Sequence, residues 1–374
     1  MRELLSELRD WHAAGTPFAL ATVVAVRGSA PRGPGSAMAV TAAGAVAGSV
    51  SGGCVESDVY ETATEALGTG RTQLRTYGIS DDEAFGVGLT CGGTIEVLVQ
   101  PCVTAEDRAL LRELADTVTS GEPVALATVV SPAASAGRHR MVLAGRVSGS
   151  LGDEGLDAAV TDDARGLLAQ GATAGIRYGP HGERRMEEVT VFVQTFAPAP
   201  RMLVFGAIDH AAATARIGAF LGYRVTVCDA RPAFATRERF PTADEVVCAW
   251  PHTYLETTPV DARTVVCVLT HDPRFDVPLL AAALRTPAAY IGVMGSRRTH
   301  ADRTARLREA GVDEAALDRL ASPVGLDLGA RTPEETAVSI AAEIIQHRWG
   351  GTGRPLGELT GTIHHAPEPW SRPA

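Results

Sequence analysis

The sequence predicts an α/β protein in two parts: an N-terminal α+β domain with an internal duplication, followed by a Rossmann-like domain with a doubly wound parallel sheet. Apolar residues make up 45% of the 374 residues and aromatic residues only 5%, which suits a soluble α/β protein of more than one domain. The segment PFALATVV at 17–24 recurs as PVALATVV at 123–130, which indicates the duplication. Further on, an apolar strand at 201–205, a glycine turn, an Ala-rich helix and a strand ending in Asp229 indicate the first βαβ unit of a dinucleotide-type fold.

The first repeat is expected at about residues 15–101. Apolar alternation and Gly/Pro punctuation divide it into short strands around one amphipathic helix, which Gly68 and Gly70 end. The expected elements are, in order, a helix at 3–14, strands at 17–26, 36–40 and 44–50, a helix at 56–67, and strands at 73–77 and 94–99.

The second repeat is expected at about residues 121–197. Residues 44–78 align without a gap on 145–179, with 11 identities. A repeat of this length is much longer than a solenoid unit, so the two copies are expected to pack as pseudo-symmetric halves of one domain at 1–197.

The Rossmann-like domain is expected at 201–349, after a linker marked by Pro198 and Pro200. The Gly/Pro-rich tail at 350–374 is expected to be loosely ordered. The expected strands lie at 201–205, 223–228, 245–248, 264–269 and 289–293, and the expected helices at 210–221, about 280–285, 299–310 and 333–348.

Charge and cysteine usage exclude several classes of function. The net charge of -10 argues against a general nucleic-acid binder. No apolar run reaches the length of a membrane span and the N-terminus is charged and amphipathic, so a cytoplasmic protein without membrane association is expected. The six cysteines lack CxxC spacing and paired Cys/His clusters, which argues against a zinc site, and disulfides are not expected in a cytosolic chain. Cys228, Cys248 and Cys267 lie in apolar runs and are expected to be buried, whereas Cys54 and Cys91 each adjoin two glycines.

The glycine-rich segment 27–56 is the strongest candidate for a ligand site in the first half. Glycine allows close approach of a ligand or of a second backbone, although Gly and Pro also punctuate ordinary hairpins. The second repeat has GDEG at 152–155 opposite SGGC at 51–54 and has no equivalent of LTCGGT. Glycines needed only for folding would be expected in both copies, so their restriction to one copy favours a ligand site. The candidate residues in this half are Arg27, Arg32, Gly33, Gly35, Gly52, Gly53, Cys54, Glu56, Cys91, Gly92 and Gly93.

The glycine turn of the second half departs from a dinucleotide-binding fingerprint. Gly206 keeps the first glycine position, but Ile208 occupies the second and Asp209 brings negative charge to where a phosphate would bind. Both changes oppose ordinary NAD(P) binding. Asp229 is placed for a ribose hydroxyl, but such an acid also caps turns.

Two further loops follow apolar strands, at the edge where open α/β sheets bind ligands. His271 beside Asp272 is either an oriented base or a turn pair. Gly295, Ser296 and Arg297 open a helix and combine free amides, a helix dipole and a guanidinium group, so they form either an anion site or a solvated first turn.

Several motifs together resemble the xanthine dehydrogenase accessory (XdhC/CoxI) family of molybdenum hydroxylase maturation factors, and the resemblance covers nearly the whole chain. SGGCVE and LTCGG are similar to the branch associated with carbon monoxide dehydrogenase-type enzymes, while many relatives have GAGH where this chain has GAID. The motifs are RGSAPRGPGSAM, GSVSGGCVESDV and LTCGGTIEVLVQP in the first half, and LGYRVTVCDARPAFATRERFPTADEVV, LTHDPRFD, YIGVMGSRR and SPVGLDLGARTPEETAVSIAAEI in the second.

The resemblance implies an accessory factor rather than an enzyme. It implies binding of the pyranopterin molybdenum cofactor, support of its terminal sulfur, and delivery to an apo hydroxylase of the xanthine dehydrogenase or carbon monoxide dehydrogenase type. A cysteine desulfurase as a second partner and a homodimer are further expectations from the resemblance.

Roles for the candidate residues follow from the chemistry of that cofactor, which carries a phosphate and a dithiolene-held metal. Close backbone approach would come from Gly33, Gly35, Gly52 and Gly53, and positive charge from Arg27 and Arg32. Cys54 or Cys91 would supply a soft ligand or a transient sulfur carrier, and Cys54 is the candidate metal ligand. Glu56 would orient the loop or begin the next helix. The alternatives are an NAD(P)-dependent oxidoreductase built on the Rossmann half and a purely structural interaction protein.

Overall fold

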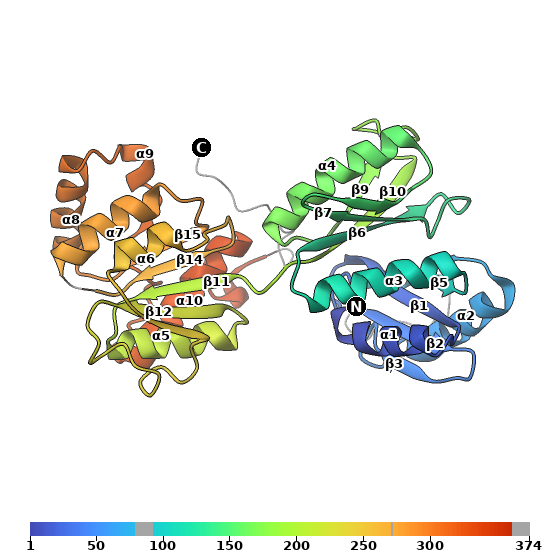
Figure 1. The fold of residues 1–374 in the computed structure, drawn as a ribbon, viewed down its shortest axis with the longest axis horizontal. Helices are drawn as coiled ribbons and strands as arrows, with labels where there is room; N and C mark the ends of the chain where they lie inside the picture. The colour runs from blue at the N-terminus through green and yellow to red at the C-terminus, as the bar shows by residue number, and fades with distance from the viewer. Residues whose placement is uncertain (79–92, 271, 361–374) are drawn as a thin grey trace. The chain divides into compact units, whose positions relative to one another are not determined.

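A computed structural model of the chain describes residues 1–78, 93–270 and 272–360 (Figure 1). The chain divides into two compact units, with the boundary between Pro198 and Ala199. Unit 1 contains two antiparallel sheets and unit 2 a parallel sheet, which confirms the predicted fold class. No helix within the described ranges is both long and apolar enough to cross a bilayer.

The first repeat folds as a five-stranded antiparallel sheet with one covering helix. Its elements are β1 (Phe18–Arg27), β2 (Ala37–Thr41), β3 (Val46–Gly48), α2 (Glu56–Thr69), β4 (Gln73–Tyr77) and β5 (Thr94–Cys102). The strand order is β3-β2-β1-β5-β4, so β1 lies in the middle. Side chains of β1 alternate between two cores: Ala19 and Ala21 face α2, whereas Phe18 and Leu20 face the opposite side.

The second repeat has the same topology. Its elements are β6 (Val124–Ser131), β7 (His139–Leu143), β8 (Val147–Gly149), α4 (Glu154–Gln170), β9 (Ala174–Tyr178) and β10 (Val189–Phe196). Their order, β8-β7-β6-β10-β9, repeats that of the first sheet strand for strand. The register gives the equivalent residues directly, because Thr22 pairs with Ala37 in one sheet as Thr128 pairs with His139 in the other.

The two repeats share a hydrophobic core that neither could bury alone. It is formed by the sheet faces turned away from α2 and α4, and by α1 (Leu5–Ala13) and α3 (Ala105–Thr119), which pack on each other. A short 3-10 turn, η1 (Arg2–Leu4), precedes α1. Leu20 of β1 and Leu126 of β6 both belong to this core, which joins the repeats into one compact unit.

Unit 2 is built on a six-stranded parallel sheet in the order β13-β12-β11-β14-β15-β16. The strands are β11 (Arg201–Phe205), β12 (Arg224–Asp229), β13 (Glu245–Cys248), β14 (Val265–Val268), β15 (Tyr290–Val293) and β16 (Leu320–Ala321). The helices are α5 (Asp209–Phe220), α6 (Pro251–Thr257), α7 (Pro273–Leu284), α8 (Arg297–Glu309), α9 (Glu314–Leu317) and α10 (Pro333–Trp349), with a final 3-10 turn, η2 (Leu356–Glu358).

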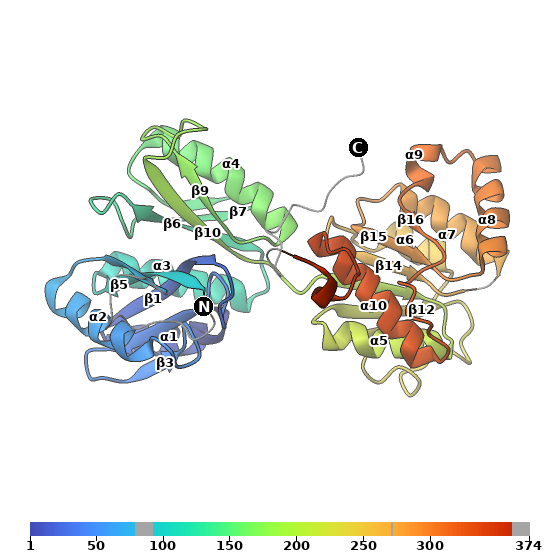
Figure 2. The ribbon, with the colours of Figure 1, turned by 180° about the vertical axis from the view of Figure 1, so that it is seen from behind.

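Helices cover both faces of this sheet, as in a doubly wound fold. Met202 and Val204 of β11 pack in the core that includes α5 and α10, whereas Leu203 and Phe205 pack in the core that includes α6, α7 and α8. Figure 2 shows α5 and α10 together on one face. The carboxyl ends of β11, β12, β14 and β15 therefore share one edge, the edge where such sheets bind ligands.

Several boundaries differ from the sequence-based expectations. Three helices, α3, α6 and α9, and the two-residue strand β16 were not predicted. Thr104 caps α3 by accepting a hydrogen bond from the Asp107 amide, a spacing visible in the sequence. Helix α7 begins at Pro273 rather than near 280, because Asp272 caps it and a proline fits the first turn. The η1 turn occupies the start of the predicted first helix, and the other predicted elements differ at their ends.

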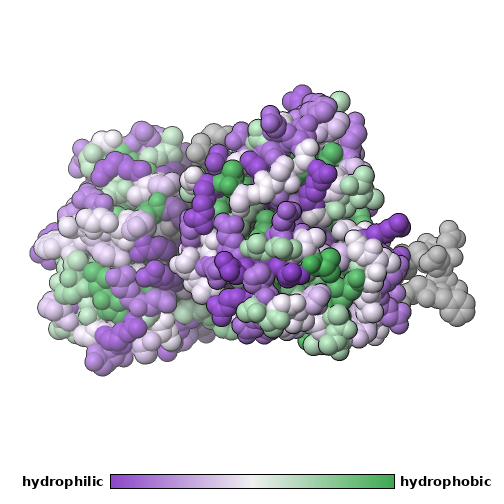
Figure 3. Space-filling model, turned by 45° about the vertical axis from the view of Figure 1, so that its right-hand side comes forward, coloured by the Kyte–Doolittle hydropathy of each residue, from purple (hydrophilic) through white to green (hydrophobic). Residues whose placement is uncertain are grey.

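Two of the three cysteines predicted to be buried are buried, and the third is not. Cys228 and Cys267 lie in the core, whereas Cys248 is exposed because β13 is an edge strand. On the face shown in Figure 3, hydrophilic residues are interspersed with small hydrophobic patches.

Candidate functional site

The loop before α2 is organised around a single carboxylate, that of Glu56. Its oxygens accept hydrogen bonds from the Ser49 hydroxyl at 2.6 Å and the Ser51 hydroxyl at 2.5 Å. They also accept from the backbone amides of Ser51 at 2.9 Å, Gly52 at 2.9 Å, Gly53 at 2.7 Å and Val55 at 3.2 Å. Burial alone would raise the pKa of Glu56, but these hydrogen bonds outweigh it and lower the pKa to about 2. Glu56 therefore both begins α2 and holds the loop.

The glycines of this loop are required by backbone conformation rather than by crowding. Gly52 and Gly53 have φ of 77° and 121°, and a Cβ at either position would meet nothing within 4 Å. Their amides donate to Glu56, so in this conformation they are not donors for the phosphate of a ligand. The sequence suggested ligand-binding amides here, and the structure shows a carboxylate of the chain itself in that place.

Cys54 lies in this loop, which hydrogen bonds to Glu56 hold in place. Its amide donates to the Ser51 hydroxyl at 3.0 Å, and the half-buried side chain packs against the same core cluster as Val26 and Ala30. Arg27 ends β1; it lies 3.3 Å from the Glu96 carboxylate, and 73% of its side chain is exposed. The loop thus presents a thiol, and the end of β1 presents an exposed guanidinium group.

Gly93 lies where the first strand and β5 come close together. A Cβ at Gly93 would lie 2.1 Å from the Ser29 carbonyl oxygen and 3.0 Å from that of Arg27, so only glycine allows this approach. The close approach at Gly93 is therefore to the backbone of the protein itself and not to a ligand. Cys91 and Gly92, which the sequence places just before it, lie outside the described residues.

Arg32 and Gly35 lie where the two repeats meet. Arg32 is 3.6 Å from Glu3, and both line a cavity of about 250 Å³. Gly35 has φ of 88°, and a Cβ there would lie 2.5 Å from Nε2 of Gln194, which donates to the Gly35 carbonyl at 3.0 Å. A Cβ at Gly33 would meet nothing within 4 Å. The close approach at Gly35 is therefore to the second repeat.

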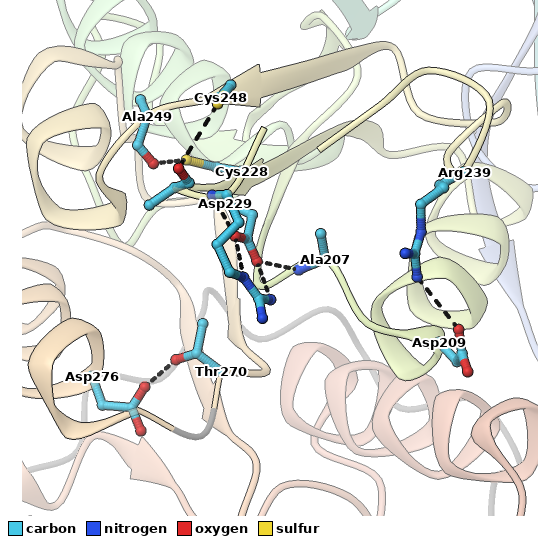
Figure 4. A network of polar contacts seen from close by, with 11 residues as sticks. Ala207, Asp209, Cys228, Asp229, Arg239, Cys248, Ala249, Thr270 and Asp276 are labelled. Carbon is cyan, nitrogen blue, oxygen red and sulfur yellow. Dashed lines mark hydrogen bonds and ion pairs between the residues drawn. The ribbon is translucent and has the colours of Figure 1, made fainter. Parts of the chain in front are cut away.

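The glycine turn of unit 2 is tied to its own acidic residue (Figure 4). The Asp229 carboxylate accepts the Ala207 amide at 2.7 Å, the Arg231 amide at 2.9 Å, and two guanidinium nitrogens of Arg231 at 2.9 and 2.8 Å. Gly206 has φ of 109° and packs against the backbone of Leu269 and Thr270. Burial opposes ionisation of Asp229, but Arg231 and the amides hold its pKa below the ordinary value. The acid predicted to bind a ribose hydroxyl is thus engaged within the protein.

The first turn of α5 repels rather than attracts a phosphate. Asp209 is its first residue, with 86% of its side chain exposed and Arg239 3.6 Å away (Figure 4). The guanidinium groups of Arg231 and Arg239 lie 4.5 and 5.3 Å from the centre of the Phe234 ring. A carboxylate at this helix N-terminus occupies the position where a dinucleotide fold binds its phosphate.

The loop at the start of α8 rests on a buried ion pair that the sequence did not reveal. Ser296 caps the helix by accepting the Thr299 amide at 3.1 Å, and Gly295 precedes it; Arg297 is exposed in the first turn. Beneath it, Arg303 donates at 3.0 Å to both Asp276 and the Met294 carbonyl. Nothing near either residue in the sequence indicates this ion pair, because it joins two separate helices that pack on the sheet. His271 lies outside the described residues.

Within each unit the predicted residues lie in more than one place. Within unit 1, Arg27, Cys54 and Gly93 belong to one end of the first sheet, whereas Arg32 and Gly35 lie at the junction of the repeats. Gly206 and Asp229 belong to unit 2, with Gly295, Ser296 and Arg297 at the end of another strand of the same sheet. In residues 1–78, 93–270 and 272–360, no three His, Cys, Asp or Glu side chains are grouped as metal ligands.

Two family models match the two units. The model described as the XdhC and CoxI family matches residues 11–78 and 117–179, which are equivalent parts of the two repeats. The model described as the XdhC Rossmann domain matches residues 202–344. The chain belongs to the XdhC and CoxI family. This confirms the resemblance seen in the sequence motifs.

Three named proteins are similar to this chain over most of its length. A Bacillus subtilis protein, named as a probable subunit of xanthine dehydrogenase, is 34% identical over 88% of this chain and 92% of its own length. The Escherichia coli molybdenum cofactor insertion chaperone PaoD is 27% identical over 90% of this chain and 85% of its own. A crystal structure of a protein named a xanthine dehydrogenase, from Bacillus halodurans, has a TM-score of 0.63 and 26% identity, and the match covers 91% of this chain and 94% of that one.

Proposed function

We propose that this XdhC and CoxI family member binds the molybdenum cofactor and inserts it into an apo molybdenum hydroxylase of the xanthine dehydrogenase or carbon monoxide dehydrogenase type. The observation that carries the proposal is the similarity to PaoD over 90% of this chain. Because that similarity spans both units, it concerns the whole chain and not only the common Rossmann fold.

The first sheet of unit 1 offers chemistry suited to such a cargo. The cofactor brings a dithiolene-held metal and a phosphate, for which a thiolate is a soft ligand and a guanidinium group a counter-charge. Cys54 is held by a loop that Glu56 fixes in place, and Arg27 is largely exposed. In this proposal Cys54 contacts the metal centre or its terminal sulfur, and Arg27 contacts the phosphate.

The finer expectations remain part of this proposal. The cofactor is delivered in its sulfurated form, with a cysteine desulfurase as the sulfur source, and the chaperone acts in the cytoplasm as a homodimer. The start of α8, with Ser296 and Arg297, is a second anion-binding position for the same cargo or its client.

The geometry of unit 2 opposes the competing proposal of an NAD(P)-dependent oxidoreductase. The Asp229 carboxylate is fully engaged with the Ala207 amide and Arg231. Asp209 places an exposed carboxylate at the N-terminus of α5, where a pyrophosphate would need positive potential. Ile208 replaces the glycine that would let the backbone approach it.

Cofactor retention tests the proposal. The chain would be purified from a host that makes the molybdenum cofactor, with metal content measured by mass spectrometry and the pterin by fluorescence after oxidation. We expect wild type to retain both, Cys54→Ala to lose most of both, and the matched control Cys248→Ala, another accessible thiol, to behave as wild type. Retention of NAD(P)H with turnover, in place of molybdenum, would overturn the proposal.

A further inference from the structure

Helix α10 has a second apolar face that unit 2 does not bury. Its inner face, which includes Ile340 and Ile344, packs in the core that α10 shares with α5 and the parallel sheet (Figure 2). On its outer face, Val338 is 50% exposed, and Ile345 and Trp349 are each 44% exposed. A helix on the surface of a domain ordinarily presents polar residues to water, so an outer face of this kind marks a surface for a partner.

The exposed residues have the spacing of a helix-packing seam. Val338, the half-buried Ala342, Ile345 and Trp349 follow one another at intervals of 4, 3 and 4 residues. These are the intervals at which apolar residues recur where one helix packs along another. We refer to these four residues as the α10 seam. The loop at 323–328 contacts α10 beside the seam, where the Gly325 amide donates to the Glu343 carboxylate at 2.7 Å.

The order of the intervals makes the α10 seam complementary to itself. Intervals of 4, 3 and 4 are the same when read in either direction, so an antiparallel copy of α10 meets the seam in register. A two-fold axis at its centre places Val338 opposite the second copy's Trp349, and Ala342 opposite the second copy's Ile345. Each contact pairs a smaller side chain with a larger one, as close packing of two helices requires.

The charges at the two ends of α10 favour the same arrangement. The first turn carries Glu334 and Glu335, the last turn carries His347 and Arg348, and none of the four seam residues is charged. An antiparallel pair brings the acidic turn of each helix towards the basic turn of the other and opposes the two helix dipoles. A parallel pair would place the acids of both copies side by side.

We propose that the α10 seam is the contact surface between two copies of this chain, with their α10 helices antiparallel. The inference rests on the homodimer that the proposed function includes, and it names the residues that form it. The seam belongs to unit 2, whereas Cys54 belongs to unit 1. Oligomeric state and cofactor retention can therefore be measured as separate properties of the same variants.

Sedimentation velocity of the full chain tests the proposal. At micromolar concentration we expect wild type to sediment with twice the chain mass. Val338→Glu and Ile345→Glu should each raise the dissociation constant of the dimer by at least about a hundredfold, because the two-fold axis introduces each charge twice into an apolar contact. The matched control is Val147→Glu on β8, where the valine is 40% exposed, and it should remain a dimer.

The orientation of the two helices has its own test. Val338→Cys and Trp349→Cys proteins would be mixed and mildly oxidised, and the cross-linked peptides identified by mass spectrometry. We expect position 338 of one copy to be joined to position 349 of the other. Joining of 338 to 338 and of 349 to 349 would contradict the antiparallel arrangement.

The outcome that would overturn the interface differs from the one that would overturn the chaperone proposal. Wild type that is monomeric, or folded Val338→Glu and Ile345→Glu proteins that both remain dimeric, would exclude the α10 seam, with folding checked by circular dichroism. A monomeric wild type that retains molybdenum and pterin would leave the chaperone proposal intact. A dimer formed through the seam that retains neither would do the reverse.

Discussion

The two repeats of unit 1 share one topology but use the same carboxylate position differently. Glu56 and Asp157 are equivalent in the gapless alignment. Glu56 accepts hydrogen bonds from two hydroxyls and four amides of its own loop. Among the described residues, Asp157 accepts one backbone amide, that of Leu151 at 2.7 Å, and pairs with Arg140 at 3.2 Å. The acid of the second repeat forms an ion pair, whereas the acid of the first binds the backbone of the loop that carries Cys54. After the duplication, the same position therefore fixes the Cys54 loop in the first repeat and stabilises only the fold in the second.

The largest effects on the free energy of unfolding are expected when the carboxylates of Glu56 and Asp157 are removed one at a time. Glu56→Ala leaves several loop amides and hydroxyls without an acceptor and should lower the free energy of unfolding by about 3 kcal/mol, whereas Asp157→Ala, with fewer donors to lose, should cost about 2 kcal/mol. Urea denaturation monitored by circular dichroism measures both. Equal losses, or a larger loss for Asp157→Ala, would contradict the role assigned to Glu56.

The second largest difference is expected between Gln100 and Gln194, the two glutamines at the junction of the repeats, in the free energy of unfolding lost on substitution. Gln100→Leu removes a cross-repeat hydrogen bond and also leaves the buried His139 nitrogen unpaired, so it should cost about 2 kcal/mol. Gln194→Leu also removes an unpartnered acceptor and should cost only about 1 kcal/mol. The same denaturation experiment compares them, and the opposite order would show that Gln194 Oε1 has a hydrogen-bond donor in solution.

Acid should weaken the second repeat before the first. The pKa of His139 is lowered by burial to about 4 from 6.5, so the unfolded chain takes up a proton that the folded chain does not, and stability falls as pH drops from about 6.5 to 4. His139→Gln should remove that dependence. Thermal midpoints measured between pH 7 and 4 test it, and an unchanged slope in the variant would exclude His139 as the cause.

The smallest expected effect concerns Glu56 at still lower pH. Its folded pKa of about 2 lies below the ordinary value of a glutamate, so its contribution to stability is present above about pH 4.5 and is lost as pH falls towards 2. Glu56→Gln should therefore lose less stability over this range than wild type. If both proteins lose the same amount between pH 4.5 and 2, the hydrogen bonds to the carboxylate do not stabilise the fold.

The sequence predicted what depends on local pattern and on the repeat itself. Recurrence of PFALATVV and the strand-glycine-helix pattern at 201–229 predicted the two sheets of unit 1 and the parallel sheet of unit 2. Helix α3 was missed although Thr104 and Asp107 carry a capping signal. The glycine density at 51–54 marked the correct loop for attention, but glycine has several uses and only the structure shows that Glu56 binds those amides.

Non-local contacts could not be predicted. Gln194 meets Gly35 across a separation of 159 residues, and nothing near either residue in the sequence indicates the pairing. The Asp276–Arg303 ion pair is similar, because it joins two helices whose packing is set by the whole sheet. The equivalence of Ala37 and His139 became visible only when strand register aligned the loops that differ most between the repeats.

The most direct measurement of the central claim exchanges the loop chemistry between the repeats. Residues 49–56 would be replaced by the equivalent segment 150–157, and cofactor retention and activation of an apo molybdenum hydroxylase would be measured for both folded proteins. The account predicts that wild type retains molybdenum and pterin and activates the hydroxylase, whereas the exchanged protein does neither. An exchanged protein that retains and delivers the cofactor as well as wild type would contradict it.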